Sequence, residues 1–146
     1  MLFRSIRKRL IAECGKVTPV NISNLSEAQL RSVGLSAAKV KTIKGLATAS
    51  LEKVIDFKRL HEQDDDVVYD SLTNLWGIGP WTVDMFMMFQ LGRLNIWPVG
   101  DLGVRRGWEK LHNLKEEITP IQLTKKGEKF VPYRSVVAWY CWRVID

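Results

Sequence analysis

Two glycines, Gly77 and Gly79, join two apolar helical segments in the run Leu75-Trp76-Gly77-Ile78-Gly79-Pro80-Trp81-Thr82. So short a turn favours glycine, because other residues adopt the required backbone angles only at a cost. It also leaves the first amides of the next helix unpaired at the positive end of the helix dipole, where they can bind an anion. We expect the amides of Gly77 and Gly79, with Thr82, to bind a phosphate, although close packing of two helices is an alternative reason for such a turn.

A lone carboxylate, Asp101, follows the loop Trp97-Pro98-Val99-Gly100 and precedes a helix that we predict from about Leu102 to Leu111. In this setting an Asp commonly serves as the helix N-cap. That role keeps the carboxylate ionised, so it is compatible with catalysis. An ionised carboxylate can stabilise the oxocarbenium-like sugar that forms when an N-glycosidic bond breaks, and it can orient the attacking water. The turn and Asp101 together predict excision of a base from DNA.

Six tryptophans occur among the 146 residues, and three of them, Trp81, Trp139 and Trp142, lie close in sequence to these elements. An aromatic pocket can stack a flipped base, and it attracts a positively charged alkylated base by cation–π interaction. The alternative, packing in the core, is expected for most of the six. We predict Trp81, Trp142 and Trp139 as the base pocket.

The charge of the chain suits a polyanionic partner. Its formal net charge is +6 and its sequence pI is about 9.5, and a basic balance of this size favours association with nucleic acid without specifying a fold. Several basic side chains are candidate phosphate contacts, and for each of them an ordinary solvated surface charge is the alternative. They are Arg105, Arg106 and Arg134, with Lys125, Lys126 and Lys129.

Length and cysteine usage narrow the class of protein. A chain of 146 residues suits one domain, which we predict to span residues 1–146. The cysteines, Cys14 and Cys141, have neither CxxC spacing nor a neighbouring His, so we expect reduced thiols, no metal and no cofactor.

No apolar run approaches the roughly 20 residues that cross a bilayer, and the N-terminus does not resemble a signal peptide. We therefore expect an intracellular protein without a membrane partner, in the cytoplasm or nucleoid, or in the nucleus of a eukaryote.

Helical spacing throughout predicts an all-α domain. Ser26 with Gln29 predicts a capping box for a helix that ends at Val33 and Gly34, and Ser36 predicts the start of the next helix. Ser50 predicts a further helix through Phe57.

Three more helices are expected along the chain. The acidic run Asp64-Asp65-Asp66 fits the start of a helix, where it complements the dipole. Pro80 fits the first turn of a largely buried helix through Leu91, and Pro132 fits the start of the last helix, through Trp142.

These motifs, in this order, resemble the helix-hairpin-helix DNA glycosylase superfamily, which has a Gly/Pro-rich loop and a catalytic Asp. The alkylation-repair branch, the 3-methyladenine DNA glycosylases, is the most similar. The hairpin Leu75–Thr82, the loop Trp97–Asp101 and the segment Pro132–Tyr140 match that branch, as does the segment Leu30–Ser36 with Lys39. The resemblance covers about residues 10 to 146.

The resemblance implies a monofunctional glycosylase acting on double-stranded DNA that contains alkylated purines, such as 3-methyladenine or 7-methylpurines. Bifunctional members carry a Lys where this chain has Trp81, so no lyase activity is expected. Asp101 is the expected catalytic residue, Trp81 and Trp142 the carried-over pocket aromatics, and the hairpin the DNA contact.

One departure from the family concerns the N-terminus. Members usually have further helices ahead of the position that is Met1 here, including the segment with the wedge that fills the gap left by a flipped base. We therefore expect a catalytic domain that lacks the usual N-terminal helices. A non-catalytic DNA-binding module and a glycosylase for oxidised or deaminated bases remain the alternatives.

Overall fold

The computed structural model describes residues 2–145, with side chains from residue 5 onward, and the regular secondary structure of this part of the chain is helical, with no β-strand. The all-α prediction is confirmed. The chain forms two compact units, one ending at Ile78 and the other beginning at Gly79. The single-domain organisation over residues 1–146 stays a prediction.

The first unit contains α1 (Leu2–Cys14), α2 (Pro19–Asn24), α3 (Glu27–Ser32), α4 (Ala37–Leu51), the 3₁₀ turn η1 (Leu60–Glu62) and α5 (Asp65–Thr73). The second contains α6 (Pro80–Phe89), α7 (Leu102–Leu111), α8 (Pro120–Gly127), the 3₁₀ turn η2 (Glu128–Phe130) and α9 (Arg134–Ile145).

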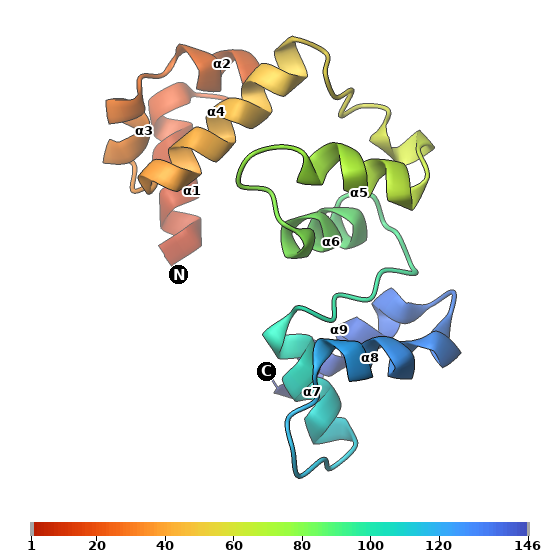
Figure 1. Ribbon diagram of the computed structural model, residues 1–146. Helices are drawn as coiled ribbons and strands as arrows, with labels where there is room; N and C mark the ends of the chain where they lie inside the picture. Colours follow the sequence, from red (N-terminus) through yellow and green to blue (C-terminus); the bar gives the residue numbers. More distant parts are fainter. Residues whose placement is uncertain (1, 146) are drawn as a thin grey trace. The chain divides into compact units, whose positions relative to one another are not determined.

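In the first unit, α4 packs against α2 and α3 (Figure 1). Apolar side chains from α1 to α4 form its core, since contact with one another removes them from water. Its fully buried members are Leu10, Ile22, Leu25, Leu30, Val33, Val40 and Ala47.

The helix starts predicted at Ser26 and Ser36 are confirmed. The Ser26 hydroxyl accepts the backbone N–H of Gln29 at 3.1 Å, and the Gln29 side chain accepts the backbone N–H of Ser26 at 2.9 Å. The Ser36 hydroxyl accepts the backbone N–H of Lys39 at 3.3 Å. Gly34, with φ +106°, ends the segment after α3, as predicted.

The helix predicted to begin at Ser50 is wrong. Helix α4 continues to Leu51, and the backbone N–H of Glu52 still donates to Thr48 at 2.9 Å, so Ser50 lies inside a helix that has already formed. Lys53 then takes a left-handed φ of 57°, which ends the helix, and Val54 is exposed. A serine followed by apolar residues is therefore not sufficient to start a helix when the backbone hydrogen bonds of the preceding helix continue past it.

The acidic run lies where predicted, at the start of α5. Asp65 and Asp66 occupy the first turn, where negative charge complements the dipole. Asp64 is the N-cap, but its side chain makes no capping hydrogen bond.

Helix α6 begins at Pro80, as expected, but it is not largely buried. Among its residues only Val83 and Met87 are buried, whereas Trp81 at its start is 53% exposed and Phe89 at its end is 65% exposed. The apolar composition of this segment therefore reflects exposed aromatic rings as well as core packing.

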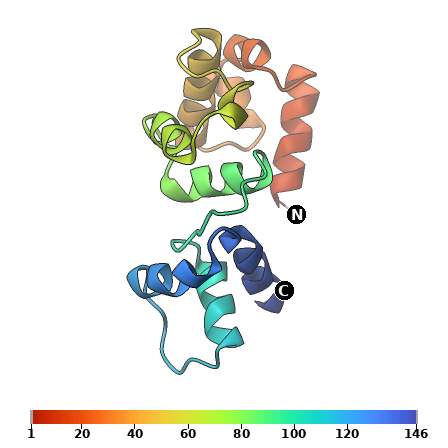
Figure 2. The same cartoon turned by 90° about the vertical axis from the view of Figure 1, so that its right-hand side faces the viewer.

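Helices α7 and α9 pack side by side in the second unit (Figure 2). The predicted bounds of α7, Leu102 to Leu111, are confirmed. Gly107 makes the close approach possible, because a Cβ at this position would overlap the backbone carbonyl of Cys141 on α9. The fully buried Trp108 and Val104 fill the core next to this contact.

The last helix begins at Arg134, so the start predicted at Pro132 is wrong by a short distance. The backbone N–H of Tyr133 donates to the carbonyl of Phe130 at 2.6 Å, which closes a turn around Pro132 ahead of the helix.

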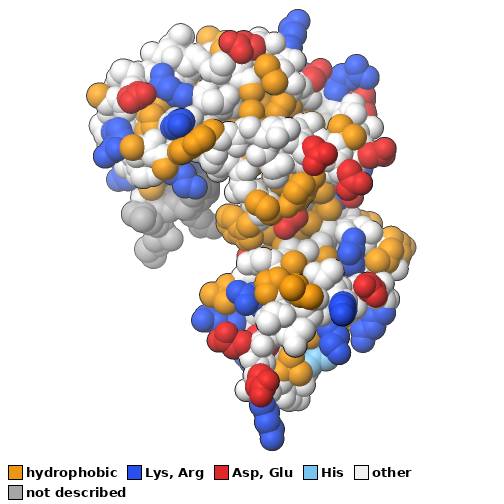
Figure 3. Space-filling model, in the orientation of Figure 1, with side chains coloured by type: hydrophobic (Ala, Val, Ile, Leu, Met, Phe, Trp, Pro, Cys, Tyr) orange, Lys and Arg blue, Asp and Glu red, His pale blue; other side chains and the backbone are white. Residues whose placement is uncertain are grey.

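None of the helices in the described part of the chain is long and apolar enough to cross a bilayer. On the face shown in Figure 3, Lys and Arg side chains alternate with Asp and Glu side chains. This face therefore shows side chains of both signs interspersed.

Replacement of Gly107 by Ala should destabilise the protein, because the added methyl group meets the backbone of α9 and neither helix can yield by a rotamer change. Overpacking of this kind costs about 1–3 kcal/mol. Urea unfolding measures the loss. Gly45→Ala is the matched control: Gly45 also lies within a helix, α4, with open space around its Cβ position. Equal stability of Gly107→Ala and wild type would contradict a close contact between α7 and α9.

Candidate active site

Asp101 is the N-cap of α7. Its Oδ1 accepts the backbone N–H of Val104 at 2.8 Å, and its φ of −74° and ψ of 123° are extended, as an N-cap requires. The structure thus confirms the capping role predicted for this residue and fixes the direction of its carboxylate.

Two tryptophan side chains from distant segments converge on this carboxylate. The indole Nε1 of Trp81, at the start of α6, donates to Oδ2 of Asp101 at 2.6 Å. The indole Nε1 of Trp142, on α9, donates to Oδ1 at 2.8 Å. Three residues singled out in the sequence therefore form one constellation, in which each carboxylate oxygen accepts one indole N–H.

These hydrogen bonds keep Asp101 ionised. Burial acts to raise the pKa of Asp101, but the indoles of Trp142 and Trp81 and the backbone N–H groups of Val104 and Gly103 outweigh it, so that the pKa lies below its ordinary value. The carboxylate is therefore negatively charged at neutral pH, and it can stabilise a cation without first losing a proton.

A further aromatic ring, Phe89, extends the site. Its ring lies 5.8 Å from that of Trp142, centroid to centroid, with the planes tilted by 31°. Phe89 and Trp81 are 65% and 53% exposed, so both offer ring surface to a planar ligand. Sequence reasoning missed Phe89. Its place at the end of the helix that begins with Trp81 was the available signal.

Trp139 is not among the residues that hydrogen-bond to Asp101. Its ring packs edge-on against Tyr140, with 5.4 Å between centroids, and the guanidinium of Arg143 lies 5.7 Å from it. It also lines an apolar groove together with Phe89 and Leu94. Its assignment to the base pocket stays a prediction.

The start of α9 holds the loop that leads to Asp101. The buried Ser135 donates its hydroxyl to the carbonyl of Arg93 at 2.8 Å and accepts the backbone N–H of Ile96 at 2.9 Å. Beside it, Nε of Arg134 donates to Oδ1 of Asn95 at 2.8 Å. Arg134, a predicted phosphate contact, thus has a structural partner, and Ser135 is a positioning residue that the sequence did not reveal.

The two hairpin glycines differ. Gly77 has φ +79°, a left-handed backbone angle that favours glycine. A Cβ at this position would also overlap the hydroxyl of Thr42, so both the backbone and the surroundings require glycine. Gly79 has an ordinary φ of −100° and open space around its Cβ position. The expectation that the turn forces glycine-only angles is therefore correct for Gly77 and wrong for Gly79.

Helix α6 begins without a capping side chain. Gly79 is its N-cap and has none to offer, and Pro80 has no N–H. The backbone N–H of Thr82 donates to the Gly79 carbonyl at 3.0 Å, which leaves its exposed hydroxyl as the group directed to solvent. No capping side chain covers this helix start, but the Thr82 amide is already paired within the protein, and phosphate binding by Gly77, Gly79 and Thr82 stays a prediction.

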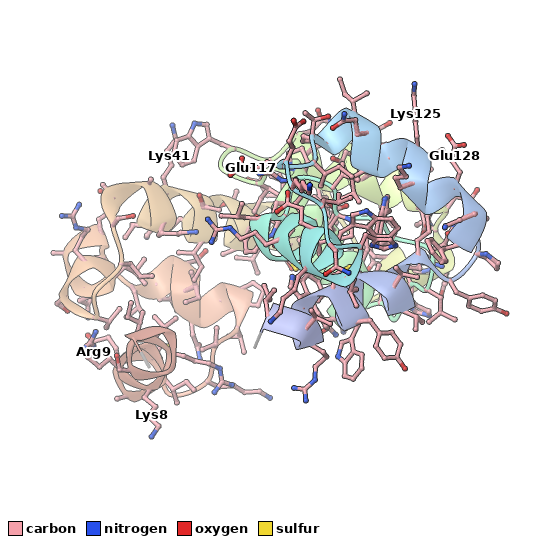
Figure 4. The ribbon with its side chains drawn as sticks, turned by 90° about the horizontal axis from the view of Figure 1, so that it is seen from below. Lys8, Arg9, Lys41, Glu117, Lys125 and Glu128 are labelled. Atoms are coloured by element: carbon pink, nitrogen blue, oxygen red, sulfur yellow. The ribbon has the colours of Figure 1, made fainter. Side chains whose placement is uncertain are left out.

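The basic side chains predicted to contact phosphate differ from one another in their burial. Nε of Arg105, one turn after Asp101, is buried without a hydrogen-bond partner among the described residues. Arg106 is exposed, and Lys125 points outward from α8 (Figure 4). Their contacts with phosphate stay predictions.

Comparison with known proteins bears on this geometry. Residues 2–133 match the model of the HhH-GPD superfamily of base excision DNA repair proteins. The chain belongs to this superfamily. The resemblance derived from the hairpin, the loop and Asp101 is therefore confirmed, and the HhH-GPD match spans both units.

Named relatives narrow the branch of the HhH-GPD superfamily. DNA-3-methyladenine glycosylase 1 of Schizosaccharomyces pombe is 34% identical over 127 residues, 86% of this chain and 56% of the relative. DNA-3-methyladenine glycosylase of Saccharomyces cerevisiae is 29% identical over 146 residues, 80% of this chain and 49% of the relative. This chain therefore spans about half the length of these relatives.

Solved structures agree with the HhH-GPD assignment. The DNA-3-methyladenine glycosidase of Bacillus halodurans superposes with a TM-score of 0.86 and 32% identity, covering 96% of this chain and 65% of that one. The 3-methyladenine DNA glycosylase of Schizosaccharomyces pombe, in complex with abasic DNA, gives a TM-score of 0.86 and 29% identity, covering 95% and 69%. The fold of this chain is that of 3-methyladenine glycosylases.

Trp142→Phe should raise the pKa of Asp101, because it removes an N–H donor to the charged form and leaves the burial that acts in the opposite direction. A carbon-13 NMR titration of the Asp101 carboxyl group measures the shift. Trp139→Phe, a change of the same kind on the same helix, should leave that pKa where it is. An unchanged pKa in Trp142→Phe would mean that the indole does not stabilise the ionised carboxylate.

Proposed function

We propose that this chain is the catalytic domain of a monofunctional DNA glycosylase that hydrolyses the N-glycosidic bond of alkylated purines in base excision repair. The observation that carries the proposal is the ionised carboxylate of Asp101 held between the indoles of Trp81 and Trp142. The HhH-GPD family and relatives named as 3-methyladenine glycosylases support it. We also propose an intracellular location, where the DNA substrate lies.

The chemistry follows from charge. When the bond between sugar and base breaks, the sugar develops oxocarbenium-like positive charge, and a fixed carboxylate stabilises it most strongly where water is scarce. Oδ1 of Asp101 already accepts the N–H groups of Trp142 and Val104, whereas the indole of Trp81 is the donor to Oδ2. A carboxylate oxygen has about two lone pairs, so Oδ2 retains the capacity to orient the attacking water. The cationic base leaves as a neutral molecule with the electron pair of the broken bond, the sugar receives the hydroxyl of that water, and the remaining proton of the water passes through the Asp101 carboxylate to solvent.

The lesion class follows from the aromatic rings. Alkylation at N3 or N7 of a purine gives the base a positive charge, which the faces of Trp81, Trp142 and Phe89 attract. The same charge makes the base a good leaving group, so Asp101 has to stabilise the sugar and does not need an acid beside the base. No amine occupies position 81, so we propose hydrolysis without strand cleavage.

We propose that the N-terminus of α6 contacts the DNA backbone. The Gly79 N-cap and the Thr82 hydroxyl would bind one phosphate of double-stranded DNA through the open helix start, and Arg105 and Arg106 would contribute charge. The relative solved with abasic DNA has the same fold over 95% of this chain, which supports the assignment.

Asp101→Asn should abolish release of free bases from methylated duplex DNA, a loss of at least about 100-fold, the lower range for removal of one transition-state contact. Asn caps helices as well as Asp, so folding and DNA binding should persist. The assay separates free 3-methyladenine and 7-methylguanine by chromatography, with binding to the same duplex measured in parallel. Base release by Asp101→Asn at the wild-type rate would remove Asp101 from the mechanism.

The wild-type result decides between this proposal and its alternatives. A folded wild-type chain that binds DNA in a salt-dependent manner without releasing any base would be a binding module. Release of oxidised or deaminated bases in place of alkylated ones would keep the enzyme and change its substrate class.

Gly79→Ala should weaken DNA binding with a loss of stability of no more than about 1 kcal/mol, because alanine is a poorer N-cap than glycine. Its φ suits any residue, and apart from its chain neighbours no atom lies within 4 Å of the added methyl group, so the folded chain should accommodate the methyl group and a reduced affinity should report on the contact with DNA. The loss should be equal for damaged and undamaged duplexes, since a phosphate contact carries no sequence information. Fluorescence anisotropy at fixed salt measures it. Unchanged affinity would restrict the hairpin to a structural role.

A further inference from the structure

We propose that Gly103 is a positioning residue for Asp101: the absence of a side chain at this place on α7 creates the space in which the indole of Trp142 reaches the carboxylate. The proposal rests on the proposed function of Asp101 for its consequence in catalysis. Its structural part stands on the geometry of Gly103, Trp142 and Asp101 alone.

The space that a side chain at position 103 would occupy is filled by the indole of Trp142 and the carboxylate of Asp101. A Cβ at this position would lie 2.8 Å from Cδ1 and 3.0 Å from Nε1 of Trp142, and 3.0 Å from Oδ1 of Asp101. Nε1 and Oδ1 are the two atoms joined by the 2.8 Å hydrogen bond. A methyl group would therefore crowd both ends of this bond at once, and the indole would have to shift from the place at which it donates to Asp101.

The indole has little freedom to move while keeping its bond. Trp142 follows Cys141, whose backbone carbonyl is held against Gly107 on α7, so the origin of the Trp142 side chain is fixed. Phe89 packs against the same indole at 5.8 Å. Gly107 thus sets the distance between the helices and Gly103, one turn earlier, sets the place of the ring.

The backbone gives no reason for glycine at this position. Gly103 lies inside α7 and has no left-handed φ. Alanine is the better residue within a helix, because glycine loses more backbone entropy on folding. The use of glycine here is therefore explained by the contact with Trp142 and Asp101.

The charge at Asp101 depends on these donors. Its pKa is set by burial, which raises it, and by N–H donors from α6, α7 and α9, which lower it, with no charged side chain among the causes. The ionisable groups nearest along these elements are Asp84 on α6, whose pKa is raised by burial to about 6, Arg105 on α7, and both neighbours of Trp142 on α9, Arg143 and Cys141. Burial raises the pKa of the Cys141 thiol to about 11, so it is neutral at neutral pH. Loss of the Trp142 donor should therefore raise the pKa of Asp101.

The test compares Gly103→Ala with Gly45→Ala, a helical glycine on α4 with open space around it. Two readouts need no activity: the carbon-13 titration of the Asp101 carboxyl and the nitrogen-15 resonance of the Trp142 indole, assigned by its loss in Trp142→Ala. Gly103→Ala should raise the pKa of Asp101 and shift the indole resonance. It should also move the acidic limb of the pH profile for base release to higher pH. Gly45→Ala should change none of these.

A double-mutant cycle isolates the mechanism. In the Trp142→Ala background the donor is already gone, so Gly103→Ala should have no further effect on the pKa of Asp101. If Gly103→Ala unfolds the wild-type chain, the steric proposal requires that Trp142→Ala restore folding to the double variant.

Two results would overturn the proposal. One is an unchanged indole resonance and pKa in folded Gly103→Ala; the other is an equal effect of Gly103→Ala with and without Trp142. Failure of the proposed function is distinguishable, because a wild-type chain that releases no base leaves both NMR readouts intact.

Discussion

The competition between burial and hydrogen bonding at the carboxylate of Asp101 is the constraint on which the second unit depends. A carboxylate withdrawn from water becomes protonated unless N–H donors replace the lost solvation. Here the donors come from the start of α6, from the first turn of α7 and from the last turn of α9. Side chains and backbone from three helices therefore act together to hold the pKa of this half-buried carboxyl group below its ordinary value.

The contacts that place these helices are small and tightly packed. Gly107 admits the backbone of α9, and the core around Trp108 holds the pair together. Ser135, at the start of α9, ties the preceding loop to the same helix through its hydroxyl. Because α9 carries both Ser135 and Trp142, a single helix fixes the loop that delivers Asp101 and the indole that keeps it charged. A displacement of α9 would disturb both together.

Local signals in the sequence were sufficient for the parts that depend on neighbours along the chain. The capping box at Ser26, the cap at Ser36 and the bounds of α7 could be predicted, since each needs only residues within one turn. The catalytic role expected of Asp101 and the phosphate contact expected of the hairpin came from the order of the motifs, and both stay predictions. Local patterns did not identify Ser135, because its partners Arg93 and Ile96 lie far away in the sequence. They placed Phe89 on the helix that begins with Trp81 but did not indicate its contact with Trp142. The helix expected at Ser50 failed because α4 had not yet ended, a fact that depends on the packing of the whole helix.

The two hairpin glycines separate the demands of the fold from those of a ligand. Gly77 is explained within the protein, by its left-handed backbone and by the hydroxyl of Thr42. Gly79 is not, because its backbone is ordinary and its surroundings are open. At a helix N-cap, Ser or Asp would stabilise α6 more than Gly does, by occupying the first amides. A capping side chain would also fill the place at which a phosphate could bind those amides. The open helix start at Gly79 is therefore compatible with the phosphate contact that we propose, whereas Gly77 is accounted for by the fold alone.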